Sequence, residues 1–226
     1  MRTPSAGKRP AVLARSETSS GRRAFSAFLI DSDLPGVVRG PDIGMIDGFP
    51  LATVAFEDVR VPASRLVGKP GDGMKAAMAG FDLFRPSVGA AALGVARRAL
   101  VEAIARVRAR PLFGKPMAEL DGMQARLADM RADVETAALA VYRAAWAGDV
   151  VGGRFSTEAA LAKLVATEAA QRVVDSAVQI FGAWGVSEES LIGRLYRELR
   201  PMRIYEGASE VQKMIIARDM LGERGS

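Results

Sequence analysis

Residues 120–145, LDGMQARLADMRADVETAALAVYRAA, carry the clearest structural pattern of the chain. Their apolar side chains recur at spacings of three and four, at Leu120, Met123, Leu127, Met130, Val134, Ala137, Val141 and Ala145. This spacing places them on one face of a long amphipathic helix. Such a face has to pack against other apolar surfaces, so the segment predicts a helical bundle.

The sequence on both sides of this segment predicts further helices. Residues 157–181 repeat apolar side chains four apart. An earlier helix is expected over 88–107, preceded by a helical piece over 73–84 and a kink at Pro86. Short loops rich in Gly and Pro, at 111–116 and 148–153, would join these helices into an antiparallel bundle.

The first part of the chain has a different character. Two β-prone runs, 24–30 and 51–61, are separated by the turn-rich segments 31–36 and 40–48. In the second run, apolar and polar residues alternate with one slip at Asp58, which predicts a half-buried strand with a bulge that ends at Pro62. The expected fold class is therefore α+β and mainly α, with a partial antiparallel β-domain followed by a helical bundle.

The composition excludes several kinds of chemistry. None of the 226 residues is Cys or His, which removes thiol nucleophiles, disulfides, zinc sites with these ligands and every Ser-His or Cys-His triad. We therefore expect no metal site, and proton transfer falls to Asp, Glu, Lys or Tyr. The net charge of +5 is scattered, so nucleic acid is not an expected partner.

The sequence also bears on location. No apolar run is long enough to span a membrane. The first 20 residues are rich in Arg and Ser, as in an organellar targeting segment, but Pro4, Gly7 and Pro10 would interrupt an amphipathic helix there. We interpret them as the start of a domain and expect a cytoplasmic protein.

Residues 203–221, RIYEGASEVQKMIIARDML, place Glu206 on a Gly-containing loop just before a helix. Ser209 and Gln212 form the pattern of a capping box, and Val211, Met214 and Ile215 are expected to form the buried face of that helix. Glu206 is a candidate general base. The alternative is that its negative charge only interacts with the helix dipole.

Five segments stand out along the chain, in this order: FEDVRVPASRLVG (56–68), GFDLFRPSVGAAALGVARRAL (80–100), RPLFGKPM (110–117), QIFGAWGVS (179–187) and RIYEGASEVQ (203–212). In sequence and in order they resemble the flavin-dependent acyl-CoA dehydrogenase family. The resemblance covers the second half of the family's middle β-domain, here 1–68, and its C-terminal four-helix domain, here 69–226. The family's N-terminal helical domain has no counterpart in this sequence.

The resemblance implies an FAD-dependent α,β-dehydrogenation of an acyl thioester to a 2-enoyl thioester. Glu206 stands where most members have the catalytic base, and Phe84, at the position of the base in a minority, cannot accept a proton. The residues that line the acyl thioester site in the family are here Phe81, Asp82, Arg85 and Gly207. Those at its FAD contacts are Arg110, Phe113, Gln179, Gly182 and Ser209, of which Arg110 and Phe113 reach the FAD of a neighbouring subunit.

The family's partners are also implied by the resemblance. They are an acyl-CoA or acyl carrier protein thioester, an electron-transfer flavoprotein, and either further copies of the chain in a dimer or tetramer or a chain that supplies the missing N-terminal half. The sequence does not indicate the acyl chain length. The alternative is a catalytically inactive truncated homologue that acts as a helical assembly partner. Related flavin oxidases and monooxygenases stay open as well, except those with a histidine base.

Overall fold

The computed structural model describes residues 10–17 and 23–222, which fall into two compact units, Met1–Phe81 and Asp82–Ser226. The boundary between the units lies inside the long helix α1, Gly73–Ala109. Pro4 and Gly7, on which the interpretation of the N-terminus rests, lie outside the described residues.

The strands of the first unit form two small antiparallel sheets. In one, β1 (Ala11–Glu17) pairs with β2 (Arg23–Leu29) along its whole length, and the short β5 (Leu66–Val67) pairs with the other edge of β2. In the other, β3 (Val37–Ile43) pairs with β4 (Leu51–Phe56). The strand predicted over 24–30 is confirmed as β2 to within one residue.

Two expectations for this unit are wrong. β4 ends at Phe56, whereas the alternating pattern predicts a strand to residue 61. Asp58, just beyond it, has a φ of 49°, which an extended strand does not accommodate. Val54 and Phe56 are 39% and 42% exposed, so this unit does not bury the apolar face of β4.

The strand β3 was missed because its sequence contains Gly40 and Pro41, which are typical of turns. The structure accommodates the proline at an irregularity, since the register between β3 and β4 shifts between Arg39 and Asp42. Proline has no N–H to donate to the neighbouring strand, and such bulges are where a strand tolerates it. The bulge therefore lies in β3 and not at Asp58.

Helix α1 is continuous through Pro86, so the two helical pieces predicted around this proline are one helix. A proline inside a helix removes one backbone hydrogen bond, here the one to the carbonyl of Asp82 four residues earlier. The helix beyond Pro86 is held in the core by a row of buried side chains that includes Ala92, Ala96 and Ala99.

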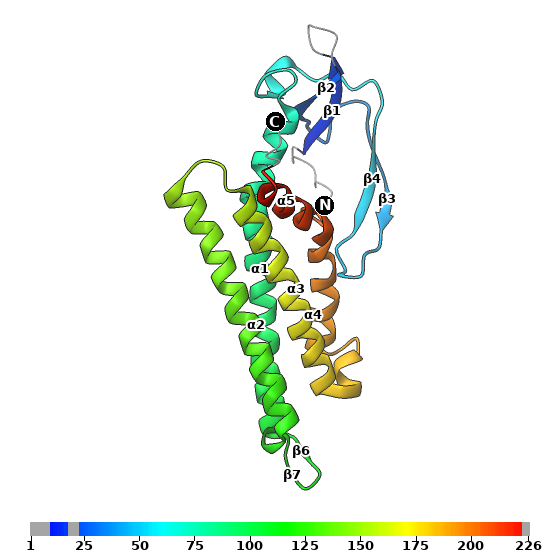
Figure 1. Cartoon of the computed structure of the whole chain (residues 1–226). Coiled ribbons are helices and arrows are strands. Elements are labelled where there is room, and N and C mark those ends of the chain that lie inside the picture. The colour runs from blue at the N-terminus through cyan, green and yellow to red at the C-terminus, as the bar shows by residue number, and fades with distance from the viewer. Residues whose placement is uncertain (1–9, 18–22, 223–226) are drawn as a thin grey trace. The chain divides into compact units, whose positions relative to one another are not determined.

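The described residues of the second unit form four further helices. They are α2 (Asp121–Trp146), α3 (Ser156–Phe181), α4 (Leu191–Leu199) and α5 (Ser209–Met220). Of these, α2, α3 and α5 match predicted segments, and α4 was not predicted. Helix α3 is central, since it contacts α2, α4 and α5. Figure 1 shows α2 and α3 side by side with opposite chain directions, as the prediction of an antiparallel bundle requires.

The connections between these helices are short. The hairpin of β6 (Pro111–Leu112) and β7 (Lys115–Pro116) follows α1, and a π-helical turn, Ala147–Val151, follows α2. Between α4 and α5 lie a 3₁₀ turn, Arg200–Arg203, and a loop over residues 204–208. The side chain of Ser190 caps α4 by accepting a hydrogen bond from the backbone N–H of Gly193.

The core of this unit is made largely of small side chains. Alanines that are fully buried come from α1, α2 and α3 and include Ala103, Ala137 and Ala166. A methyl group at Gly89 in α1 would lie only 3.1 Å from the carbonyl oxygen of Ala162 in α3, so the two helices approach closely there. None of the described helices has the length and apolar character needed to cross a bilayer.

Candidate active site

The loop over residues 204–208 has an unusual backbone. Glu206 has a φ of 57° and Gly207 a φ of 92°, so two consecutive residues lie in the left-handed region. Glycine adopts this region readily, whereas a glutamate does so only at some energetic cost. A non-glycine residue held in this way is a frequent feature of functional sites.

Side chains from three helices hold the two carbonyl groups of this loop. The Glu206 carbonyl oxygen accepts hydrogen bonds from Arg85 Nε on α1 (3.4 Å) and from Gln212 Nε2 on α5 (3.2 Å). The Gly207 carbonyl oxygen accepts from the same Gln212 Nε2 (2.8 Å) and from Lys163 Nζ on α3 (2.8 Å). We call these four hydrogen bonds the carbonyl anchor.

The Glu206 side chain is only partly exposed. Its Oε2 atom is buried and has no hydrogen-bond partner among the described residues. A buried carboxylate oxygen without a hydrogen-bond partner is energetically unfavourable and rare in protein cores. It is therefore available to a ligand or a proton that reaches the site.

Arg85 is linked to two further polar side chains of the same unit. Its guanidinium lies 3.4 Å from Asp82 Oδ1, and the Ser156 hydroxyl donates to Asp82 Oδ2 at 2.5 Å. Both charged residues are buried, with Arg85 only 4% exposed. Burial lowers the pKa of Arg85, and the carboxylates of Asp82 and Glu206 partly offset this effect. Arg85 is therefore a core residue and not a solvated helix residue.

Both ends of the loop are bound to one carboxylate, that of Glu168 on α3. Arg203 contacts its two oxygens at 2.9 and 2.8 Å, and the Ser209 hydroxyl donates to Oε1 at 2.5 Å. Burial alone would raise the pKa of Glu168, but the hydrogen bonds from Ser209 and Arg203 outweigh it and hold this pKa below its usual value. Glu168 thus stays ionised and fixes the loop to α3.

The predicted capping box is wrong. The residue that precedes α5 is Ala208, which has no side-chain cap, and Ser209 and Gln212 use their side chains on Glu168 and on the carbonyl anchor. The predicted buried face is wrong for Val211 and Met214, which are 40% and 50% exposed. For Ser209 the physical reason is that the Glu168 carboxylate is a stronger acceptor than a neutral group.

Four of the five residues predicted to contact FAD form a separate group. Arg110, Phe113, Gln179 and Gly182 are all exposed, and Phe113 is 87% exposed. They lie at one end of the helical unit, where Arg106 of α1 lies 5.3 Å from the ring centroid of Phe181 at the end of α3. Gln179 is 16 residues beyond Lys163 on α3, which corresponds to about 24 Å. The structure therefore does not bring this group to Glu206 within one chain.

The remaining predicted residues are distributed as follows. Ser209 is buried and near Glu206, and Gly207 directly follows it. Phe81 belongs to the other compact unit and is partly buried.

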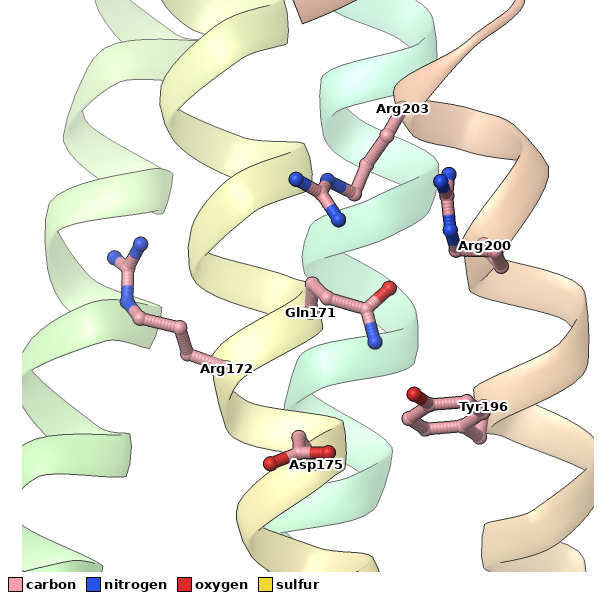
Figure 2. A pocket seen from close by; sticks show the side chains of 6 residues that line it. All are labelled: Gln171, Arg172, Asp175, Tyr196, Arg200 and Arg203. Atoms are coloured by element: carbon pink, nitrogen blue, oxygen red, sulfur yellow. The ribbon is translucent and has the colours of Figure 1, made fainter.

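A shallow pocket of about 260 Å³ lies elsewhere in the helical unit. Figure 2 shows the side chains that line it, which come from α3, α4 and the following turn: Gln171, Arg172, Asp175, Tyr196, Arg200 and Arg203. Glu206 is not among them. We therefore do not assign this pocket to the chemistry of Glu206. The link between the two is Arg203, which lines the pocket and also binds Glu168 at the start of the loop.

Sequence reasoning missed two residues that organise the loop, Lys163 and Glu168. A signal for the first exists, because Lys163 shares a helix face with Ala159, Ala166 and Ala170, all of which are buried. A lysine on a buried, alanine-lined helix face is unusual, because a buried ammonium group needs a hydrogen-bond or charge partner. For Glu168 we find no comparable signal, since its partners lie 35 and 41 residues further along the chain.

Comparison with known proteins places the chain in a family. Residues 71–221 match the family model of the acyl-CoA dehydrogenase C-terminal domain. A cyclohexane-1-carbonyl-CoA dehydrogenase from Geobacter metallireducens is 36% identical over 218 residues, which are 94% of this chain and 56% of that protein.

Solved structures agree with this result. Butyryl-CoA dehydrogenase from Megasphaera elsdenii has a TM-score of 0.89 at 36% identity, over 95% of this chain and 56% of that one. A structure of PigA with FAD and proline has a TM-score of 0.86 at 29% identity, over 95% and 57%. The chain thus spans about half the length of these relatives. It belongs to the acyl-CoA dehydrogenase family.

Proposed function

We propose that this chain carries the catalytic base of an FAD-dependent acyl-CoA dehydrogenase, which converts an acyl-CoA or acyl carrier protein thioester into a 2-enoyl thioester. The observation that carries the proposal concerns Glu206. One oxygen of its carboxylate is buried and has no partner among the residues that the structure describes, and the loop is held at the carbonyls of Glu206 and Gly207. The relatives that support it include a protein named for a dehydrogenase reaction on an acyl-CoA.

In this proposal Glu206 removes the α-proton of the thioester. The electron pair of the broken C–H bond forms the α,β double bond as the β-hydrogen leaves with its own electron pair. FAD, when bound, supplies the acceptor for that hydride, and an electron-transfer flavoprotein takes the electrons afterwards. The carbonyl anchor keeps Glu206 fixed, and a fixed base in the correct geometry needs less reorganisation to reach the transition state.

Asp82, Arg85 and Gly207 would form the surroundings of the thioester. Arg85 is buried beside the Glu206 carbonyl, so it can act on the substrate only through short-range contacts at this loop. Phe81 stays part of the proposal from the resemblance. The proposal places the boundary between the β-domain and the helical domain after residue 68. The match to the family's C-terminal domain begins close to it, at residue 71.

The exposed group at the other end of the helical unit fits FAD. Arg110 has no ion-pair partner in the described part of the chain, so its guanidinium is available to a phosphate. Phe113 offers an exposed ring for stacking. Gly182 has a φ of 64°, and no atom of the described residues lies within 4 Å of where its side chain would begin, so a cofactor can approach its backbone. The Ser209 hydroxyl donates to Glu168, so it would act on a cofactor only as an acceptor.

The separation of the two groups along α3 suits an arrangement in which Arg110, Phe113, Gln179 and Gly182 contact the FAD of a neighbouring subunit. We therefore propose a dimer or tetramer. Exposed apolar side chains on α2, at Leu139, Tyr142 and Trp146, would be covered in such an assembly. A cytoplasmic location is part of the same proposal.

The test is an absorption experiment on the purified protein. FAD is added, unbound cofactor is removed, and the visible flavin band is followed without oxygen as straight-chain acyl-CoA thioesters are added. We expect bleaching by at least one thioester, and a bleaching rate about 10²- to 10⁴-fold lower in Glu206→Gln. Glu210→Gln, which changes an exposed carboxylate four residues away, should bleach normally. Protein that never retains FAD, or a Glu206→Gln variant that bleaches at the normal rate, would disprove the proposal.

A further inference from the structure

Lys163 is a fully buried lysine at the inner face of α3, with an exposed fraction of 0%. Its ammonium nitrogen donates to the Gly207 carbonyl oxygen at 2.8 Å. No carboxylate of the described residues lies within ion-pair distance of it. Burying a charge without a direct counter-ion is unfavourable. An apolar side chain at this position would fill the core without this penalty, so the ammonium group itself has a role.

The contact of Lys163 falls on the part of the loop that most needs support. Glu206 and Gly207 both have backbone conformations in the left-handed region, and a glutamate keeps this conformation only when surrounding contacts enforce it. Of the three side chains in the carbonyl anchor, Lys163 is the one that belongs to the central helix. Its hydrogen bond carries a full charge, which makes it stronger than a neutral one.

Charged groups face Lys163 from every side of the site. They are Glu168 on its own helix, Arg85 on α1, Arg203 before the loop and Glu210 on α5. Burial lowers the pKa of Lys163 to about 8, and Glu168 partly offsets this effect. The lysine is therefore mainly protonated at neutral pH and loses its proton in mildly alkaline solution.

We propose that Lys163 is a positioning residue, which holds the Gly207 carbonyl through its charged ammonium group and thereby fixes the direction of the Glu206 carboxylate. The proposal rests on the proposed function, in which Glu206 is the base. It adds that the base is correctly placed only while Lys163 is protonated. Lys163 acts through the loop and touches neither the substrate nor the cofactor.

The kinetic test uses the FAD-loaded protein and three variants. Lys163→Met removes the ammonium group with little change in shape. Lys163→Arg keeps a charged donor, and Lys213→Met removes an exposed lysine of α5 close to the same loop as a matched control. At pH 7, Lys163→Met should bleach about 10- to 100-fold more slowly, with a KM for the thioester within about threefold of the wild type.

The pH profile separates positioning from a general loss of structure. The wild type should lose activity as pH rises through about 8. Lys163→Met should lack this decrease, and Lys163→Arg should recover most of the rate at pH 7 without the decrease, because a guanidinium keeps its charge. A folded Lys163→Met protein with the wild-type rate and pH profile would overturn the proposal.

A second measurement does not depend on catalysis. Hydrogen exchange of a peptide that contains residues 203–209 reports how well the loop is held. Lys163→Met should exchange at least about tenfold faster there than Lys213→Met, since a charge-assisted hydrogen bond is lost. If neither protein bleaches but this difference is present, the proposed function fails and the structural part of the inference stands. Equal exchange in the two variants contradicts the inference whatever the activity.

Discussion

Replacing Lys163 with methionine should change how the stability of the helical unit depends on pH. Lys163 is fully buried, and burial lowers its pKa from 10.5 to about 8. In the unfolded chain the same lysine is solvated and has its usual pKa of about 10.4. The folded protein therefore binds fewer protons than the unfolded chain at any pH between these two values.

The sign of the effect follows from this difference. Stability rises with pH wherever the unfolded state binds more protons, so Lys163 makes the free energy of unfolding rise between about pH 8 and pH 10.5. Below pH 8 both states are protonated, and the contribution is absent. Each pKa unit corresponds to about 1.4 kcal/mol, so the full rise is about 3 kcal/mol.

Urea unfolding, followed by tryptophan fluorescence, measures this change. Both tryptophans of the chain, Trp146 and Trp184, lie in the helical unit and report on its unfolding. The free energy of unfolding of the wild type, minus that of Lys163→Met, should rise by about 2 to 4 kcal/mol from pH 7 to pH 10.5. The same difference taken with Lys213→Met should be nearly flat. A flat difference for Lys163→Met would refute the reasoning, because the buried lysine would then titrate as if it were solvated.

Three further tests address other parts of the structure. Glu168→Gln removes the carboxylate that pairs with Arg203 and accepts from Ser209 at the two ends of the loop, and it should lower the free energy of unfolding by about 1 to 2 kcal/mol in urea denaturation. Gly193→Ala should destabilise the unit by about 1 to 3 kcal/mol, since its methyl group would lie 2.6 Å from a backbone oxygen, whereas Gly94→Ala, on an open face of α1, should stabilise it by about 0.5 to 1 kcal/mol. Arg110→Ala should weaken FAD binding about 10- to 100-fold in a fluorescence titration, whereas Arg108→Ala, an exposed neighbour, should not. An unchanged free energy of unfolding in Glu168→Gln or in the two glycine variants, or equal FAD affinity in the two arginine variants, would contradict the respective assignment.

The long helices could be predicted from the sequence because their apolar residues repeat over many turns. The stripe at 120–145 became α2, and residues 157–181 became α3 with a shift of one residue. The two separate helical pieces expected around Pro86 illustrate the limit of local rules. Helix α1 runs through this proline, and buried side chains beyond it, such as Ala92 and Ala96, hold that part of the helix in the core.

The candidate site was predicted in part. The sequence placed Glu206 on a Gly-containing loop before a helix, as the structure has it, but it did not indicate that both Glu206 and Gly207 have positive φ. The partners of the loop could not be found in the same way. Ser209 matches a local capping pattern, yet its hydroxyl donates to Glu168, a residue 41 positions away that only the folded chain brings near. The local sequence does not show that a distant carboxylate competes with the nearby backbone for this hydroxyl.

The chemistry of Glu206 is tested most directly by α-proton exchange. A CoA thioester whose β-methylene is replaced by sulfur can lose its α-proton but has no β-hydrogen to lose as hydride. The FAD-loaded protein is incubated with this thioester in deuterated water, and deuterium at the α-carbon is measured by mass spectrometry. Wild type and Glu210→Gln should exchange the proton rapidly, and Glu206→Gln should be about 10²- to 10⁴-fold slower. Exchange at the wild-type rate in Glu206→Gln would show that another group is the base.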